Sequence, residues 1–461
     1  MNRNWNDSKS FCCNVCPIFK VGDGGTNEPL DVQLNGTQLK GTGNANAVFG
    51  TTRGDGLVVR CRLRRVSNSR SSKGSGNRDD HDHGNECNNR NLQLLALEER
   101  MWSRRDLATK RDTAEDQLMY ASRIVAPLLG VRFLPLSRRL ENVSFDTPPR
   151  TLKDSIVTDS GILMTDGTLL VGKDPESVVC LELKPKFGGI VRCDTVPHQH
   201  RHLKHVKSRY QLHQALKLEQ NRIDRRSAYD PLDLFSNDSS RMQRAVEALM
   251  ECPQNNLAVF LGGVRVQPEE AARGLDRACE ILQCGSMACL ASAVQSILAW
   301  EGILRDLLRM QTLCEYDVHA VEALLRQMLD GDQKRIGEGR ALGENGGSVD
   351  GTTAFLERMA ASSEAARLDV LADYCTSATA KDCSILVSMT RETFNDMNTS
   401  GVRRDDRIKQ GNRPCELGLL GGIAYRVTVV DLDKKSLKKL KAHKQLDENI
   451  MRANLISEAN R

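Results

Sequence analysis

The segment Cys180-Leu-Glu-Leu-Lys-Pro-Lys186 combines one carboxylate with two lysines at alternate positions. Residues two apart share a face of an extended chain, so Glu182, Lys184 and Lys186 are predicted to project toward one site. Pro185 blocks a helix and favours the extended form. Phosphoryl transfer needs such a set, because cations neutralise phosphate oxygens and a carboxylate positions metal or nucleotide. A solvated edge strand would show the same pattern, so this alternative stays open.

Two further segments place polar side chains next to turns or strands. Ala378-Thr-Ala-Lys-Asp-Cys-Ser384 sets Asp382 just before an apolar run, where a carboxylate can act as a base toward a hydroxyl or cap a turn. Pro253-Gln-Asn-Asn256 ends in paired amides, which can donate to phosphate or hydroxyl oxygens. Such amides are more often turn builders or caps, so these residues by themselves leave both roles open.

An acidic pair and a lysine-rich run follow each other near the end of the sequence. Asp431 and Asp433 end an apolar strand and share a face, where paired carboxylates can hold magnesium. Lys435 and Lys439 are four residues apart, which puts them on one face of the helix expected from Ser436 onward. A run of charges is usually a solvated helix face. Its position directly after the acidic pair favours a binding site.

Hydrophobic patterning predicts an α+β chain with strands toward both ends and a helical middle. Strands are expected at residues 56–64, 162–171, 178–183, 384–389 and 424–430. Helices are expected at residues 93–129, 203–226, 239–250, 268–331, 360–371 and from 436 onward. We divide the chain into a loose segment 1–30, an N-lobe 31–164 and a C-lobe 165–461. The N-lobe contains the Gly-rich hairpin segment 40–49 and an insert, 66–92, that we expect to be disordered because it has almost no apolar residue.

Composition limits the class of protein. Among 461 residues, 65 lysines and arginines face 60 acidic residues, a net charge of +5 that is far from a nucleic-acid-coating protein yet allows a local basic pocket. The fifteen cysteines are scattered and form no framework of the small secreted type. No apolar stretch approaches the ~18–20 residues of a membrane span, and no signal core is visible. We therefore expect a cytosolic or nuclear protein without a membrane partner.

Six segments in this order resemble the inositol-pentakisphosphate 2-kinase family. They are Glu182-Leu-Lys-Pro-Lys186, Leu212-His-Gln-Ala-Leu-Lys217, Tyr229-Asp-Pro-Leu-Asp-Leu-Phe-Ser236, Pro253-Gln-Asn-Asn256, Thr379-Ala-Lys-Asp-Cys-Ser384 and Asp431-Leu-Asp433. The resemblance covers residues 37–65 and 120–455 with the inserts excluded. Six ordered motifs are far more specific than the Gly-rich segment alone. The resemblance implies a two-lobed inositol-polyphosphate-kinase-like fold with a helical inositide-binding insertion.

The resemblance also implies a role for each matching position. Asp382 would accept the proton of the 2-hydroxyl and Lys184 would reach the transferred phosphoryl group. Magnesium would bind Asp431, with Asp433 as a second ligand. ATP would contact Gly41, Gly43, Asn46, Arg60, the hinge residues Thr165 and Asp166, and Glu182. The inositide pocket would be lined by Arg150, Lys186, Arg209, His213, Lys217, Asn255, Asn256, Lys435, Lys439 and His443.

Some positions depart from the family pattern. Ala258 stands where the family commonly has Arg, which removes a nucleotide contact or shifts it to another residue. Lys439 replaces an Arg of plant members, which keeps the charge but loses bidentate binding, and His443 replaces a Tyr. The plant zinc site uses a Cys-x-x-Cys pair in the helical middle, and residues 300–345 contain no such pair. We therefore expect no zinc of the family type.

Together these features predict a monomeric kinase that uses ATP and Mg²⁺. It would transfer the γ-phosphoryl group to the 2-hydroxyl of inositol 1,3,4,5,6-pentakisphosphate and give inositol hexakisphosphate, without requiring nucleic acid. An inactive inositide-binding scaffold is the first alternative; Ala258 favours it, while Asp382 and Asp431 count against it. A nucleic-acid-binding protein that uses the basic C-terminal helix is the second, and an aromatic fraction of 4% disfavours it.

Overall fold

The computed structural model describes residues 31–33, 39–42, 46–50, 56–65, 81–107, 114–140, 142–144, 155–330, 351–392 and 417–459. Expectations for residues 1–30 and 66–80 therefore lie outside the described residues, as do the roles given to Gly43 and Arg150.

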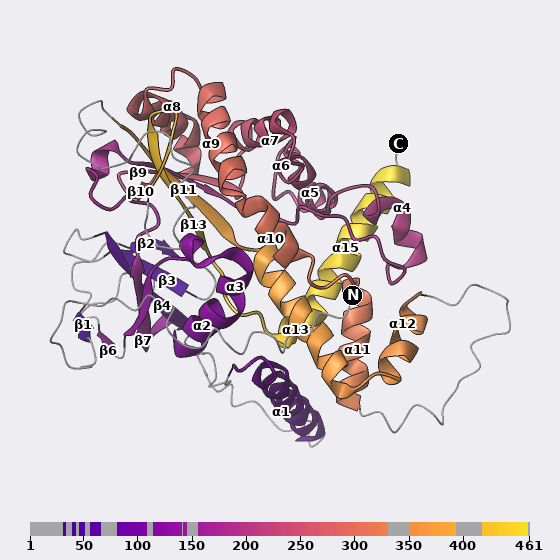
Figure 1. Cartoon of the computed structure of the whole chain (residues 1–461). Coiled ribbons are helices and arrows are strands. Elements are labelled where there is room, and N and C mark those ends of the chain that lie inside the picture. The colour runs from indigo at the N-terminus through magenta and orange to yellow at the C-terminus, as the bar shows by residue number, and fades with distance from the viewer. Residues whose placement is uncertain are drawn as a thin grey trace, which may run out of the picture.

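An antiparallel sheet of five strands forms the N-terminal part (Figure 1). Its order is β2 (Leu39–Thr42), β3 (Asn46–Gly50), β4 (Leu57–Arg65), β7 (Ser155–Thr165) and β5 (Ser137–Leu140). The predicted hairpin is confirmed, because β3 pairs with β4 and Val48 lies opposite Arg60. A small parallel pair joins β1 (Asp31–Gln33) to β6 (Asn142–Ser144).

The strand predicted at 162–171 begins and ends earlier than expected. Strand β7 ends at Thr165, because the Asp166 carboxylate accepts hydrogen bonds from the Thr168 amide at 2.9 Å and the Thr168 hydroxyl at 2.6 Å. This Asx-type turn ends the extended run and leads the chain out of the first sheet.

A second antiparallel sheet, of six strands, lies at the centre of the C-terminal part. Its order is β10 (Val264–Arg265), β9 (Leu257–Leu261), β8 (Val179–Leu183), β11 (Ser384–Arg391), β13 (Ile423–Val430) and β12 (Gly418–Leu420). The three predicted strands of this sheet are confirmed as β8, β11 and β13. The β9–β10 hairpin was not predicted from the sequence, although Leu257–Leu261 is an apolar run.

Helices make up the rest of the described chain. Those before β9 in the chain are α1 (His81–Ser103), α2 (Ala114–Tyr120), α3 (Ala126–Leu129), α4 (Arg201–Lys204), α5 (Arg209–Glu219), α6 (Pro231–Leu234) and α7 (Ser239–Glu251). Those after β10 are α8 (Ala271–Leu282), α9 (Met287–Glu301), α10 (Ile303–Gln311), α11 (Val318–Asp330), α12 (Gly351–Ala360), α13 (Glu364–Lys381) and α15 (Leu440–Ala459). The described chain is thus an α+β fold, as predicted.

Helix boundaries correct two expectations. Helix α1 begins at His81, so the end of the segment predicted to be disordered, 66–92, belongs to a helix. The long helical region predicted at 268–331 is divided into separate helices. Gln283 and Gly302 adopt left-handed backbone conformations at these breaks, with φ of 51° and 67°.

One hydrophobic core joins the second sheet to the helices around it. Tyr229, Val246, Leu290 and Val387 belong to this core and are fully buried. In Figure 1, α8 and α9 lie beside this sheet, while α15 runs past α5 and α11 on the other side. No single helix in the described ranges is long and apolar enough to cross a membrane. One pair of consecutive helices with a bend between them, Pro268–Leu282 and Met287–Glu301, meets the requirement for a membrane span by length and composition only.

Candidate active site

Asp382 lies where three distant segments meet. Helix α13 ends at Lys381 and strand β11 begins at Ser384, so Asp382 occupies the helix C-cap. Its carboxylate accepts a hydrogen bond from Lys435 Nζ at 2.8 Å, and Lys186 Nζ lies 3.6 Å away. The Asp382 side chain is 60% exposed, which leaves it accessible to a reactant.

The lysines decide the ionisation of this carboxylate. Partial burial of Asp382 favours its neutral form, but Lys435 and Lys186 outweigh this effect and lower the pKa of the Asp382 carboxyl group. Burial lowers the pKa of the Lys186 ammonium, against the attraction of Asp382. Asp382 is therefore a charged acceptor at neutral pH, paired with lysines that a phosphate could also bind.

A second group of carboxylates lies at the same end of the six-stranded sheet. Strands β8, β11 and β13 are neighbours, and Ser384 pairs with the last residue of β13. The Ser384 hydroxyl donates to Glu182 at 2.7 Å and lies 3.4 Å from an Asp431 oxygen. Lys184 Nζ lies 3.9 Å from Glu182. Ser384 thus links the two carboxylates assigned to nucleotide and metal, a link that sequence reasoning missed although Ser384 belongs to a quoted motif.

Two site segments contain non-glycine residues with left-handed backbone conformations. Lys186 and Asp431 both have positive φ, 60° and 61°, although neither is glycine. Such conformations cost on the order of 1–3 kcal/mol and persist only where surrounding contacts enforce them. Lys186 lies three residues after the end of β8, and Asp431 directly follows β13. These two turns direct side chains of both segments to the region around Asp382.

Residues of the N-terminal part hold the segment after β13. Arg60 of β4 binds the Asp433 carboxylate at 2.7 Å. On helix α1, Glu98 accepts hydrogen bonds from the Ser436 hydroxyl and the Leu437 amide, both at 2.6 Å. The carboxylate predicted as a second metal ligand is thus paired in the structure with the arginine predicted to contact ATP. These contacts fix the backbone on both sides of Lys435.

The predicted hinge residues are buried between the two sheets. The Thr165 amide donates to Leu136 at 2.9 Å, and the Asp166 amide donates to Gly56 at 2.7 Å. Because the Asp166 carboxylate caps the Thr168 turn, it is already occupied within the protein. Gly41 and Asn46 lie on strands β2 and β3 of the neighbouring sheet.

Cations from three segments act on two histidines near Asp382. Burial, together with Lys217 and Arg209, lowers the pKa of His213 to about 4. Burial, together with Arg209 and Lys435, lowers the pKa of His443 to about 4. Both histidines are therefore neutral near pH 7, and both lie within the field of Arg209. Several of the cations predicted for the inositide pocket thus lie near one another in the structure, although they come from distant segments.

The other residues assigned to the inositide pocket differ in exposure and in hydrogen-bond partners. Lys217 donates to the exposed Asn255 at 3.4 Å, whereas Asn256 is fully buried and its amide donates to the Tyr210 hydroxyl at 3.1 Å. Asn256 therefore supports the wall of the pocket instead of presenting its amide group at the surface. Lys439 is exposed on the turn Leu437–Lys439 that precedes α15. His443 Nδ1 lies 3.1 Å from the Tyr374 hydroxyl.

Two basic residues near the site were missed by sequence reasoning. Arg222 folds back after α5, its amide donates to the Lys217 carbonyl at 2.9 Å, and its charge helps to lower the pKa of Lys217. No spacing signal marked Arg222, because the helix was expected to continue to residue 226. Lys381 precedes Asp382, and its ammonium lies 4.4 Å from the centre of the Phe187 ring. Burial lowers the pKa of Lys381 to about 8.

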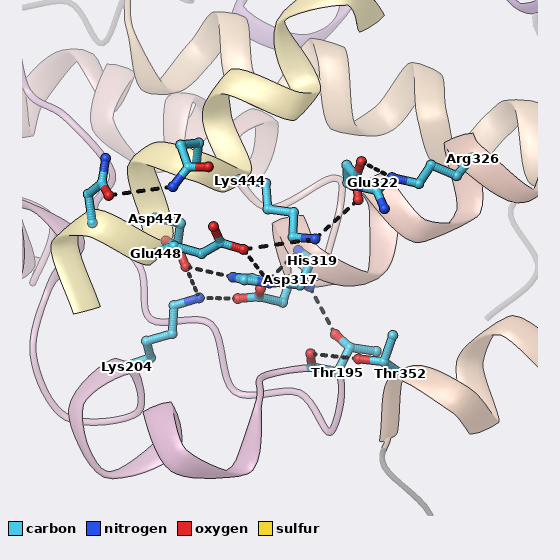
Figure 2. A network of polar contacts seen from close by, with 12 residues as sticks. Thr195, Lys204, Asp317, His319, Glu322, Arg326, Thr352, Lys444, Asp447 and Glu448 are labelled. Atoms are coloured by element: carbon cyan, nitrogen blue, oxygen red, sulfur yellow. Dashed lines mark hydrogen bonds and ion pairs between the residues drawn. The ribbon is translucent and has the colours of Figure 1, made fainter. Parts of the chain in front are cut away.

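Metal-ligand geometry occurs elsewhere in the described residues. Asp317, His319 and Asp447 have ligand atoms within 4.8 Å of one another, and no other described group of three or more such side chains is this close. Lys204 Nζ lies 2.5 Å from Asp317 and 2.7 Å from Asp447, so an ammonium already neutralises this cluster (Figure 2). Asp431 is not part of such a group. Magnesium often binds one or two carboxylates plus substrate phosphates, so its site does not require one.

A charged base between lysines, a neighbouring carboxylate pair and a basic pocket define an enzyme site for phosphorylated substrates. The family model described as Inositol-pentakisphosphate 2-kinase matches residues 40–449. Because this match spans most of the sequence, the chain belongs to the inositol-pentakisphosphate 2-kinase family, which confirms the resemblance seen in the motifs.

Individual relatives agree with this assignment. The chain is 26% identical to the inositol-pentakisphosphate 2-kinase of Arabidopsis thaliana over 389 residues, which cover 78% of this chain and 81% of the relative. It is 27% identical to a relative of the same description from Oryza sativa subsp. japonica, over 64% of each chain. A Danio rerio relative is 32% identical over 184 residues, 34% of this chain and 37% of its own.

Proposed function

We propose that this protein transfers the γ-phosphoryl group of ATP to the 2-hydroxyl of inositol 1,3,4,5,6-pentakisphosphate and releases inositol hexakisphosphate. The observation that carries the proposal is the position of Asp382, between Lys186 and Lys435 and at the border of the carboxylate group and the basic pocket. Membership of the family supports the same reaction.

In the proposed mechanism, Asp382 accepts a hydrogen bond from the 2-hydroxyl and orients its oxygen for in-line attack. Its carboxylate is ionised at neutral pH, so it can take the proton as the new O–P bond forms and the bond between the γ-phosphorus and the bridging oxygen breaks, which releases ADP. Lys435 pairs with Asp382 at 2.8 Å in the structure, and a substrate phosphate would compete for that ammonium. Substrate binding would then free the base at the moment when the hydroxyl arrives.

Asp431 fits the metal role by its chemistry. It offers an exposed carboxylate, its one described hydrogen-bond contact is the 3.4 Å approach of Ser384, and hard oxygen ligands suit Mg²⁺. When bound, Mg²⁺ neutralises charge on the β- and γ-phosphates of ATP. Glu182 and Lys184 lie on the same side of Asp382, where they would orient the nucleotide and the transferred group.

The basic pocket determines the proposed substrate class. ATP phosphates need only magnesium, a glycine loop and one or two cations. Here Lys186, Arg209, Lys217, Lys435 and Lys439 come from three segments around one space. Arg222 adds a sixth positive charge near Lys217. Such a surplus suits a second polyanion, because each substrate phosphate must exchange water for a charged donor.

A product assay tests the proposal. Purified protein is incubated with ATP, Mg²⁺ and a panel of inositol phosphates, and the products are separated by anion exchange. Conversion of the pentakisphosphate with a free 2-hydroxyl into the hexakisphosphate is expected, and inositol phosphates already carrying a 2-phosphate should remain unchanged at that position. Absence of any phosphorylated product would contradict the proposal. We also expect a cytosolic or nuclear monomer that needs neither a membrane nor nucleic acid.

A catalytically inactive inositide-binding scaffold is the second candidate, and Ala258 is the observation in its favour. Ala258 pairs with Glu182 across β8 and β9, so the Arg of other family members would approach Glu182. In this chain Lys184 Nζ, 3.9 Å from Glu182, is the nearby cation. Tight binding of the pentakisphosphate without any turnover would favour the scaffold.

A further inference from the structure

Arg209 connects the basic pocket to a buried network of charges. Its guanidinium binds the carboxylate of Asp447, which lies on α15 and whose side chain is 1% exposed. Asp447 also contacts Lys204 Nζ at 2.7 Å and His319 Nε2 at 3.4 Å. Figure 2 shows that Lys204, Asp317, His319 and Asp447 converge from different segments. Arg209 itself is 38% exposed, so one part of its side chain is buried against this network and another faces outward.

The network balances its charges internally. Lys204 and Arg209 face the carboxylates of Asp317 and Asp447, so two positive charges meet two negative charges. Burial of a lone carboxylate favours its neutral form, yet the surrounding partners outweigh this and lower the pKa of Asp447. A permanent negative charge is therefore held directly behind Arg209.

Lys204 takes the place that a divalent cation would take in this cluster. The ligand atoms of Asp317, His319 and Asp447 lie within 4.8 Å of one another, a spacing typical of a metal site. Lys204 Nζ instead approaches both carboxylates, at 2.5 and 2.7 Å, and its side chain is 8% exposed. The ammonium thus joins α4 to α15 and to the residue that precedes α11. Because Lys204 is covalently part of the chain, its presence in the cluster does not depend on the concentration of any ion in solution.

We propose that Asp447 is a positioning residue, which holds Arg209 so that its remaining donors face the inositide phosphates. This inference rests on the proposed function, which places Arg209 in the substrate pocket. A guanidinium has five N–H donors in a planar fork, so fixing one edge by Asp447 orients the others. A flexible side chain held in place before binding loses less rotamer freedom when the substrate arrives.

The effect of Arg209 on both His213 and His443 agrees with this role. Its charge lowers the pKa of both histidines, which belong to α5 and α15 on two sides of the pocket. Without Asp447, the Arg209 side chain could extend into water and leave this space. Lys204 acts one step further away, because it compensates the second oxygen of Asp447.

A double-mutant cycle tests the proposal, with the full chain and the Michaelis constants for inositol pentakisphosphate and ATP as readouts. Arg209→Ala and Asp447→Ala should each raise the constant for the inositide by about tenfold, because a charged hydrogen bond is lost or misplaced. The constant for ATP should change less than about twofold. In the double variant, the loss should equal that of Arg209→Ala alone, because Asp447 acts through Arg209.

Two more variants separate positioning from general stability. Glu448→Ala changes the next residue on α15, which lies 4.0 Å from His319 and 3.9 Å from Lys444, and it should leave both constants unchanged. Asp447→Asn keeps an oxygen that can accept from Arg209, so it should recover part of the loss. If Asp447→Ala does not fold, Asp447→Asn with and without Arg209→Ala completes the same cycle.

The outcomes distinguish the pocket role of Arg209 from the positioning role of Asp447. If Arg209→Ala leaves the inositide constant unchanged in an active enzyme, the pocket assignment of Arg209 in the proposed function is wrong. If Arg209→Ala raises it but the Asp447 variants do not, or if their effects add in the double variant, Asp447 is not a positioning residue. A lower thermal midpoint with unchanged Michaelis constants would also overturn the proposal.

Discussion

Replacing Asp382 with asparagine removes the base and keeps the shape of the side chain. An amide cannot accept the proton of the 2-hydroxyl, and a general base contributes about 10²–10⁴-fold to a rate. At 1.36 kcal/mol per factor of ten, this corresponds to a barrier increase of about 3–5 kcal/mol. We therefore expect Asp382→Asn to lose most turnover.

Folding stability and substrate binding should respond differently from turnover to the Asp382→Asn substitution. The Asp382 side chain is 60% exposed, so its ion pairs with Lys186 and Lys435 contribute only about 0–1 kcal/mol to folding. Loss of the carboxylate also frees both ammonium groups for substrate phosphates. The dissociation constant for the pentakisphosphate should then stay equal or decrease, which calorimetry can measure on the same sample.

A single-turnover assay with ATP, Mg²⁺ and the pentakisphosphate gives the chemical rate directly. Asp369→Asn serves as a control, because Asp369 lies on α13, the helix whose C-cap is Asp382, and pairs with Arg104 at 3.5 Å. The pKa of Asp382 is lowered, so the wild-type rate should not vary with its titration near neutral pH. A rate for Asp382→Asn within about tenfold of wild type would refute the assignment of Asp382 as base.

Three further predictions address metal, substrate charge and stability. Asp431→Ala should abolish turnover at any magnesium concentration, and normal activity would remove Asp431 from the metal role. Lys217→Ala and Lys435→Ala should raise the Michaelis constant for the pentakisphosphate about tenfold and leave that for ATP unchanged; the reverse pattern would contradict the pocket. Burial lowers the pKa of Lys381 from 10.5 to about 8, so the folded state binds this proton less tightly than the unfolded state. Lys381→Met should therefore stabilise the fold by about 1–3 kcal/mol near pH 7, and urea unfolding should show this gain shrink as the pH rises from about 8 to 10.5 and vanish above that range.

Local patterns predicted much of the second sheet. The apolar runs before Glu182, after Cys383 and before Asp431 became β8, β11 and β13, because a strand buried on both faces needs a continuous apolar sequence. Helix ends were harder to predict. The helix expected at 360–371 is divided at Ser363, and α13 then continues to Lys381, which makes Asp382 the C-cap of a helix.

Side-chain roles depended on neighbours that no local pattern specifies. Asn255 and Asn256 are adjacent and equivalent in sequence, yet one is exposed at Lys217 and the other is buried under Tyr210. Arg222 resembled any other charge at the end of a helix. Its role became visible only when the chain was seen to fold back toward Lys217.

By itself, the sequence determined which groups were available and on which local elements they lie. It placed a carboxylate before β11, lysines after β8 and a basic stretch after β13, because side-chain type and periodicity are local properties. Only the tertiary structure decided the pairs: Lys435 with Asp382 across 53 positions, Arg209 with Asp447 across 238 and Arg60 with Asp433 across 373. Contacts over such separations come from the packing of sheets and helices in one core. That packing directs each charge to its partner.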